Sequence, residues 1–275
     1  MVESALLLDD CSSVTWSNNF NGLTDGCGNT GNAEVTFTAT DGCGNTSTTT
    51  ATFTIIDTNS PPITRPADDI TVECDGNGNL AELQAWLDNH GGATAFDTCS
   101  EITWTNNFNG LTTTCGNTAS ATVLFTVTDE CGLSSSSSGV FTIIDTTAPT
   151  FNEALPADLT VECDAVPTAE TLTATDNCGD ATVTFNETRN DGSCPSNYTL
   201  VRTWTATDAC GLTTEHSQTI TVQDTTAPTF NEALPADLTV ECDAVPTAET
   251  LTATDNCGHD NSNFQRNSQR WILSF

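Results

Sequence analysis

The chain has thirteen cysteines, most of them in a repeated frame, so disulfide bonding is the first chemistry that it indicates. In each copy of the frame, three cysteines and a closing aspartate follow one another at intervals of 16, 16 and 14 residues. The copies are Cys11, Cys27, Cys43 and Asp57; Cys99, Cys115, Cys131 and Asp145; and Cys178, Cys194, Cys210 and Asp224. A leading cysteine in the phrase Thr-Val-Glu-Cys-Asp recurs at Cys74, Cys163 and Cys242. Such frames are typical of small extracellular modules that disulfide bonds stabilise.

The spacing of the frame also limits which cysteines can pair. Each step between neighbours crosses a module along one strand of about six residues, or roughly 20 Å. Bonded cysteines need Cα atoms about 4.4 to 6.8 Å apart, so neighbours in the frame should not pair. We predict the pairs Cys11–Cys43, Cys74–Cys115, Cys99–Cys131, Cys163–Cys194 and Cys178–Cys210. Cys27 and Cys242 have no partner within their own partial modules and are candidates for an intermolecular bond.

Zinc binding in a reducing compartment is the alternative use of so many cysteines. No Cys-x-x-Cys pair occurs, and the histidines His90, His216 and His259 lie outside the frame. Structural zinc sites usually take closely spaced cysteine and histidine ligands, so this pattern disfavours zinc.

Aspartates accumulate where successive modules should meet. We expect the closing Asp of a module and the Asp after its leading cysteine at the same end of that module. We expect the turn aspartates of the next module at the end that faces them. Calcium takes about 6 to 8 hard oxygen ligands and tolerates irregular geometry, so we predict calcium between modules. The candidate ligands are Asp57, Asp75, Asp97, Asp129, Asp145, Asp164, Asp176, Asp208, Asp224 and Asp255. The alternative is that these residues only cap tight turns.

The charge balance excludes some partners and makes counter-ions necessary. The chain has 37 acidic and 5 basic residues, a formal net charge of −32. Binding nucleic acid requires Lys and Arg to neutralise phosphates, so we expect no nucleic-acid partner. The sequence has no run of about 20 apolar residues, so we expect no membrane insertion. The first residues also lack the features of a signal peptide, so we expect a secreted precursor to be longer than the chain shown.

The elements that must position these residues are mainly β-strands. Apolar and Thr residues alternate over 35–39, 123–127 and 159–163, which is the period of strands with one buried face. We therefore predict an all-β fold of tandem immunoglobulin-like β-sandwiches. One helix near 79–89 is the exception, with Leu80, Leu83, Trp86 and Leu87 on its apolar face. We expect it to cap an open end of the core; a partner-binding helix is the alternative.

An internal repeat sets the domain boundaries. The 35 residues Asp145–Gly179 recur letter for letter at Asp224–Gly258, 79 positions later. We predict an incomplete repeat lacking its first strand (1–57), complete repeats over 58–145 and 146–224, a half repeat (225–258) and a divergent tail (259–275). Short proline-containing links should make the array linear and semi-rigid. No nucleophile elbow or paired His-Asp setting accompanies the abundant serines, so we expect no enzyme.

Several joined phrases carry a resemblance to a known family. They are Thr-Val-Glu-Cys-Asp (71–75), Trp-Thr-Asn-Asn-Phe (104–108), Ile-Ile-Asp-Thr-Thr-Ala-Pro (143–149) and Thr-Ala-Thr-Asp-Asn-Cys-Gly (173–179). Over residues about 9–258 the chain resembles the hyalin-repeat-like (HYR-like), immunoglobulin-like repeats of secreted surface adhesins and fibres in Bacteroidota. The resemblance implies an extracellular, cell-surface location and makes Thr146 and Thr225 candidate O-glycosylation sites. Asn-x-Ser/Thr sequons add Asn45, Asn186 and Asn197 as glycosylation candidates.

Three functions remain open on the sequence. The first is a disulfide-linked, calcium-stiffened fibre or stalk, in which the half repeat of one chain completes the first repeat of the next by strand addition. A longer array, in which neighbouring repeats lie on the same chain, would leave the same pattern. The second is a spacer in a ligand-binding adhesin. The third is a carbohydrate-binding module that uses Trp16 and Trp104.

Overall fold

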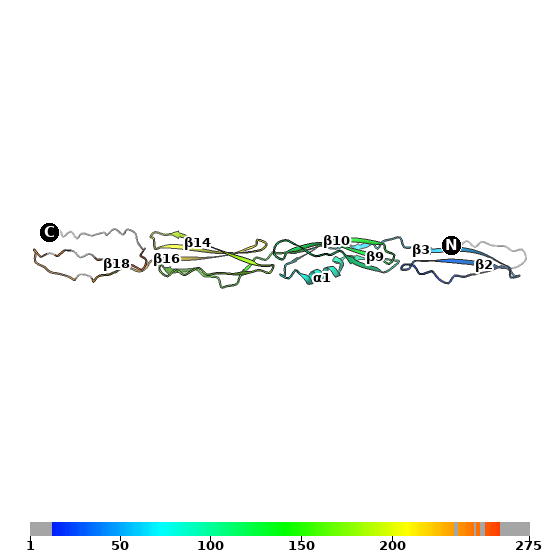
Figure 1. Ribbon diagram of the computed structural model, residues 1–275, viewed down its shortest axis with the longest axis horizontal. Coiled ribbons are helices and arrows are strands. Elements are labelled where there is room, and N and C mark those ends of the chain that lie inside the picture. Colours follow the sequence, from blue (N-terminus) through cyan, green and yellow to red (C-terminus); the bar gives the residue numbers. More distant parts are fainter. Residues whose placement is uncertain (1–12, 234–235, 245, 248–250, 259–275) are drawn as a thin grey trace. The chain divides into compact units, whose positions relative to one another are not determined.

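A computed structural model of the protein describes residues 13–233, 236–244, 246–247 and 251–258. The chain divides into two compact units, Met1–Thr146 and Thr147–Phe275. Almost all regular structure in both units is β-strand, which confirms the predicted all-β class (Figure 1). Of the helices that the structure describes, none has the length and apolarity needed to cross a bilayer.

The predicted second repeat, in the first unit, contains a complete sandwich. Its larger sheet has the order β5-β10-β9-β7, with β8 paired to β9. β5 runs parallel to β10, whereas the other pairs in this sheet are antiparallel. A separate pair, β4-β6, forms a second sheet. The strands are β4 (Ile63–Arg65), β5 (Ile70–Glu73), β6 (Thr94–Ala95), β7 (Ile102–Asn106), β8 (Thr112–Thr113), β9 (Ala119–Asp129) and β10 (Ser134–Ile144).

The single α-helix of the described residues packs into the core of this sandwich. It is α1 (Leu80–Asp88), which lies beside β9 and β10 in Figure 1. The Trp86 ring lies 5.1 Å from that of Phe125 on β9 and 5.7 Å from that of Phe141 on β10. The helix therefore supplies a hydrophobic layer facing the sheet, rather than the end cap that we expected. Leu80, which we placed on the apolar face, is 67% exposed.

A short 3-10 helix, η1 (His90–Gly92), ends this segment and requires a glycine. Gly91 has a φ of 65°, and a Cβ atom there would lie 3.0 Å from the Phe125 ring. Both the conformation and the space favour glycine, so the chain can turn tightly over the core.

The predicted first repeat contains only one sheet among the residues that the structure describes. β1 (Thr15–Asn18), β2 (Gly31–Thr40) and β3 (Thr46–Ile55) form an antiparallel sheet in that order. No residue of β3 is buried, although its sequence alternates like that of a core strand. Phe53 on β3 is 60% exposed. Within the described residues, one face of this sheet is therefore left uncovered.

The second unit repeats the complete architecture. Its larger sheet has the order β12-β16-β15-β14, with β12 parallel to β16, and β11-β13 form a separate pair. Trp204, Ile220 and Val222 are almost fully buried. The strands are β11 (Thr150–Phe151), β12 (Leu159–Glu162), β13 (Ala174–Thr175), β14 (Ala181–Asp191), β15 (Tyr198–Asp208) and β16 (Thr213–Gln223). Beyond them, β17 (Thr229–Phe230) pairs with β18 (Ala253–Thr254).

Candidate metal centre and disulfide bonds at the module junctions

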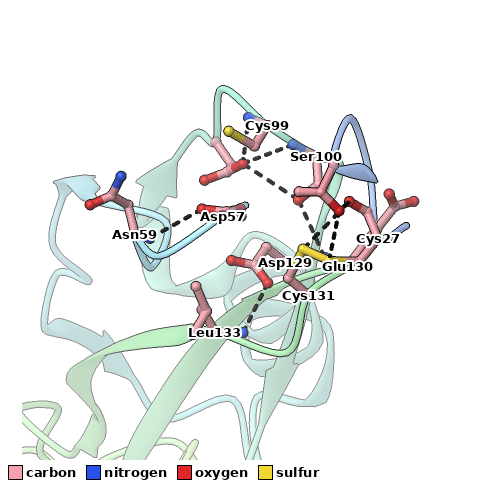
Figure 2. The surroundings of a disulfide bond; sticks show 11 residues. Cys27, Asp57, Asn59, Cys99, Ser100, Asp129, Glu130, Cys131 and Leu133 are labelled. Atoms are coloured by element: carbon pink, nitrogen blue, oxygen red, sulfur yellow. Dashed lines mark hydrogen bonds between the residues drawn. A yellow bond between two sulfur atoms is a disulfide. The ribbon is translucent and has the colours of Figure 1, made fainter. Parts of the chain in front are cut away.

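A disulfide bond joins the first predicted repeat to the second. Cys27 and Cys131 are bonded, with Cα atoms 5.1 Å apart and a separation of 104 positions in sequence. The Asn29 amide also donates a 2.7 Å hydrogen bond to the Cys99 carbonyl. We call this meeting of the 27–30 turn with the turns at 97–100 and 129–133 the first junction (Figure 2).

Three predicted calcium ligands meet at the first junction, and each caps a turn with one carboxylate oxygen. Asp57 Oδ1 accepts a hydrogen bond from the Asn59 amide. Asp97 Oδ1 accepts from the amides of Cys99 and Ser100. Asp129 Oδ1 accepts from the Leu133 amide at 2.9 Å. The turn-capping alternative therefore accounts for the Oδ1 atom of each of these three carboxylates.

The second oxygens of two of these carboxylates are buried without a donor. Among the described residues, the Oδ2 atoms of Asp57 and Asp129 are inaccessible and accept no hydrogen bond. Asp129 as a whole is only 6% exposed. A buried polar atom without a partner costs about 1–3 kcal/mol, and more when it is charged. Turn capping does not account for these two atoms.

The geometry of the junction fits a hard cation. Oxygens of Asp57 and Asp97 and the Cys99 sulfur lie within 4.8 Å of one another, as do oxygens of Asp57 and Asp129 and the Cys131 sulfur. Asp57 is common to both groups, and Figure 2 shows it on the same side of the disulfide bond as Asp129. No ion pair among the described residues neutralises these carboxylates. A calcium ion would take the free oxygens as ligands and offset their repulsion.

Asp75, another predicted ligand, has a different role. Its Oδ1 accepts hydrogen bonds from the amides of Asn77 and Asn79 in the loop before α1. These bonds, that of Asn79 foremost, lower the pKa of the exposed Asp75 carboxyl below its ordinary value. The turn-capping alternative accounts for the observed contacts of this residue.

The second unit repeats the carboxylate pattern at Asp176 and Asp208. Asp176 Oδ1 accepts from the Cys178 amide, and Asp208 Oδ1 accepts from the amides of Cys210 and Leu212. The Oδ2 atoms of both aspartates are buried without a donor, and the two carboxylates offer oxygens within 4.8 Å of each other. Asp145 belongs to the first unit, so its partnership with them remains a prediction.

A second cluster lies at the end of the second unit. Glu162, Asp224 and Cys257 offer ligand atoms within 4.8 Å of one another. Asp224 and Asp255 also line one pocket of about 650 Å³. Glu162 was absent from our predicted ligands, although its place in the repeated Thr-Val-Glu-Cys phrase was a usable signal. The role of Asp164 remains a prediction.

Two disulfide bonds join different cysteines from those that we predicted. Cys131 bonds Cys27 instead of Cys99, and Cys163 bonds Cys257 instead of Cys194. The prediction compared distances within a module, whereas each junction brings cysteines of successive modules within bonding distance. The Cα atoms of Cys163 and Cys257 are 5.7 Å apart. Cys99 and Cys194 are consequently free thiols.

The remaining cysteines fall into two groups. Cys74, Cys115, Cys178 and Cys210 are all disulfide-bonded, and the pairs Cys74–Cys115 and Cys178–Cys210 remain predictions. Cys43 and Cys242 are exposed free thiols, so the predicted Cys11–Cys43 bond is wrong. Cys11 itself lies outside the described residues. Because Cys27 is already bonded, the predicted intermolecular Cys27–Cys242 bond would first require disulfide exchange.

The glycosylation candidates differ in how free their side chains are. Thr146 Oγ1 donates to Glu73, and Thr225 Oγ1 donates to Glu162. Asn197 accepts a hydrogen bond from the Asp224 amide, and Asn45 donates one to Asp41. Exposed Asn186 donates only a long 3.4 Å bond to Thr188. Modification of all five residues remains a prediction.

The two tryptophans proposed for carbohydrate binding have different surroundings. His90 stacks on Trp104 with ring centroids 4.7 Å apart, and so covers one face of that indole. Trp16 on β1 is 52% exposed. A sugar could therefore stack on the exposed Trp16 ring, whereas His90 already occupies one face of the Trp104 ring.

Comparison with known proteins agrees with the cysteine frame. Residues 151–222 match the family described as the HYR-like domain with 4 cysteines. The matched segment contains Cys163, Cys178, Cys194 and Cys210. A search of curated proteins gave no match.

Solved structures similar to this chain include extracellular domains of protocadherins. The protocadherin GammaB4 extracellular domain is 18% identical, with a TM-score of 0.29 over 84% of this chain and 46% of that one. Cadherin domains 1–5 of protocadherin Gamma B2 are 15% identical, with a TM-score of 0.31 over 83% of this chain and 57% of that one. The chain thus spans about half the length of these two proteins.

Proposed function

We propose that this protein is an extracellular structural repeat protein, a fibre or cell-surface stalk whose junctions calcium stiffens. The observation that carries the proposal is the first junction. There a disulfide bond joins two modules beside two carboxylate oxygens, on Asp57 and Asp129, that are buried without donors. A covalent link and a bridging cation would both restrict movement at the same point.

The rest of the chain supports the same function. The HYR-like match and the disulfide bonds favour an extracellular array, and HYR-like domains are structural or adhesion modules rather than enzymes. The net charge of −32 requires bound counter-ions if the modules are to stay close together. A spacer in a longer adhesin would use the same stiff junctions. The exposed Trp16 leaves carbohydrate binding as a further candidate.

Thermal unfolding with and without calcium tests the proposal. We expect calcium to raise the Tm of the full chain, because an ion present at about 100 times its Kd stabilises by about 2.7 kcal/mol. Asp129→Asn should abolish the part of this increase that arises at the first junction, since it removes one ligand charge but keeps the turn-capping oxygen.

The matched control is Glu34→Gln, which removes one charge from an exposed position on β2 of the same unit. It should keep the calcium response of the wild-type protein. A wild-type Tm that is the same in calcium and in a chelator would remove calcium from the proposed function and leave the disulfide-linked array.

A further inference from the structure

We propose that the outer edge of β3 is an acceptor site for a second copy of this chain, and that the donor is the half repeat 225–258. The donor strand would be Leu238–Glu241, parallel to β3, with Leu238 opposite Phe53 and Val240 opposite Ile55. The inference rests on the proposed structural function and names the contact through which copies join.

The equivalent strands of the complete repeats carry a parallel strand on this edge. Counting back from the closing aspartate, Phe53 of β3 matches Phe141 of β10 and Ile220 of β16. Phe141 pairs with Ile70 of β5, and Ile220 pairs with Leu159 of β12. Among the described residues, β3 pairs only with β2. Within the described part of the chain, its other edge therefore offers unpaired backbone groups.

Burial shows what β3 lacks. Phe141 and Ile220 are both 0% exposed, whereas Phe53 is 60% exposed. β10 and β16 share one pattern of alternating buried positions, and β3 has no buried residue. A strand with a core-type sequence and an exposed aromatic ring is an incomplete sandwich half.

The donor segment has the sequence of a leading strand but no partner strand among the described residues. Residues 236–243 have the same sequence as residues 157–164, which include β12. In the second copy these residues form no strand, and Leu238 and Val240 are 69% and 42% exposed. In the first copy Leu159 and Val161 pack against the core cluster around Ile220 and Val222.

Two side-chain anchors fix the register. The first anchor is the Asp that precedes the leading strand. Asp69 accepts a hydrogen bond from the Val140 amide, and Asp158 accepts one from the Thr219 amide. In each case the donor directly precedes the core residue that matches Phe53. The Glu that ends the strand accepts hydrogen bonds from the threonine after the closing aspartate, in the pairs Thr146–Glu73 and Thr225–Glu162.

Both anchors exist in the proposed contact. Asp237 of the donor would accept from the Thr52 amide, and Glu241 would accept from Thr58. The carboxylates come from the donor and the amides and hydroxyl from the acceptor, so the halves are complementary in hydrogen bonding.

The donor half repeat also brings the missing second layer. Its β17-β18 pair has the same register as β11-β13, with Phe230 opposite Ala253 as Phe151 is opposite Ala174. Donor and acceptor belong to different units of the chain, so each copy can engage two others head to tail. Contacts of this kind extend into filaments when they do not close into a ring.

The test combines one acceptor-deficient and one donor-deficient full-length variant. Phe53→Asp should block the acceptor edge, and Val240→Asp should block the donor strand; both residues are exposed, so neither substitution should unfold the chain. We expect wild-type protein to form oligomers whose size rises with concentration in sedimentation velocity. Each variant alone should remain monomeric, and an equimolar mixture should form dimers and nothing larger.

Leu155→Asp, at an exposed leucine outside both surfaces, is the control and should oligomerise like wild type. A monomeric wild-type chain, single variants that still form long oligomers, or a mixture without dimers would each overturn the proposal. None of these results changes the calcium response of the monomer, so the test of calcium-stiffened junctions stays separate.

Discussion

The segment Asp145–Gly179 and its identical copy Asp224–Gly258 adopt partly different structures. The short antiparallel pair forms in both copies with the same register. Its supporting hydrogen bonds also recur, because Glu153 accepts from Thr173 and Glu232 accepts from Thr252. The leading strand differs, since Leu159–Glu162 is a strand and 238–241 is not.

The difference shows which contacts are local to the segment. Phe151 and Ala174 both lie within the repeated segment, so their pairing needs nothing outside it. Leu159 pairs with Ile220, which lies in β16 and beyond the repeated segment. Strand structure at these positions therefore depends on the partner strand as well as on the sequence.

The cysteines of the two copies differ in the same way. In the first copy Cys163 and Cys178 are both disulfide-bonded. In the second copy Cys242 is free, and Cys257 bonds Cys163 of the first. The two copies are thus linked to each other through positions that are not equivalent in the repeat.

The largest expected effect comes from breaking this link between the copies. Cys257→Ser should lower the free energy of unfolding by up to about 4 kcal/mol, because the bond closes a loop of 94 residues in the unfolded chain. Urea unfolding of the second unit in the full chain measures the loss.

Cys242→Ser is the matched control, because that cysteine is free, and it should leave stability unchanged. Non-reducing peptide mapping supplies the direct comparison. Recovery of Cys163 joined to Cys194 would restore the pairing predicted from sequence and contradict the link between copies.

Much of the fold follows from the sequence because its signals are local. Alternation over 123–127 and 159–163 predicts β-strands, and the structure has them as β9 and β12. The spacing of Leu83, Trp86 and Leu87 predicts the helix, and all three are buried. Its position in the core is not predictable in this way, because it depends on contacts with Phe125 and Phe141 far along the chain.

The candidate site is predictable in composition but not in detail. Asp57, Asp97 and Asp129 meet at one junction, as their expected places at facing module ends predict. Which oxygen caps a turn and which is left without a donor depends on side-chain orientation. The bond between Cys27 and Cys131 does not follow from spacing within one module, because it forms where two successive modules meet.

A smaller loss of stability is expected when an aspartate replaces the valine in the leading segment of the first copy, and none when it replaces the equivalent valine of the second. Val161→Asp should destabilise the second unit by about 2–3 kcal/mol, because Val161 packs against the buried cluster of Ile220 and Val222. Val240→Asp, the same change in the other copy, should leave the Tm unchanged in dilute solution. Equal losses for the two variants would show that 238–241 packs like β12 within the monomer.

The smallest expected effect concerns the hydrogen bonds from threonine to glutamate that both copies form beside the short antiparallel pair. Hydrogen bonds from Thr173 and Thr252, the backbone amide first and the hydroxyl second, lower the pKa values of the exposed Glu153 and Glu232 carboxyls from their ordinary value of 4.5. A lowered pKa in the folded state stabilises the fold above pH 4.5, and this contribution is lost as the pH falls through the lowered value. NMR titration of the two carboxyls should give matching midpoints below 4.5. An ordinary midpoint at Glu232 alone would mean that the short antiparallel pair also needs the complete repeat around it.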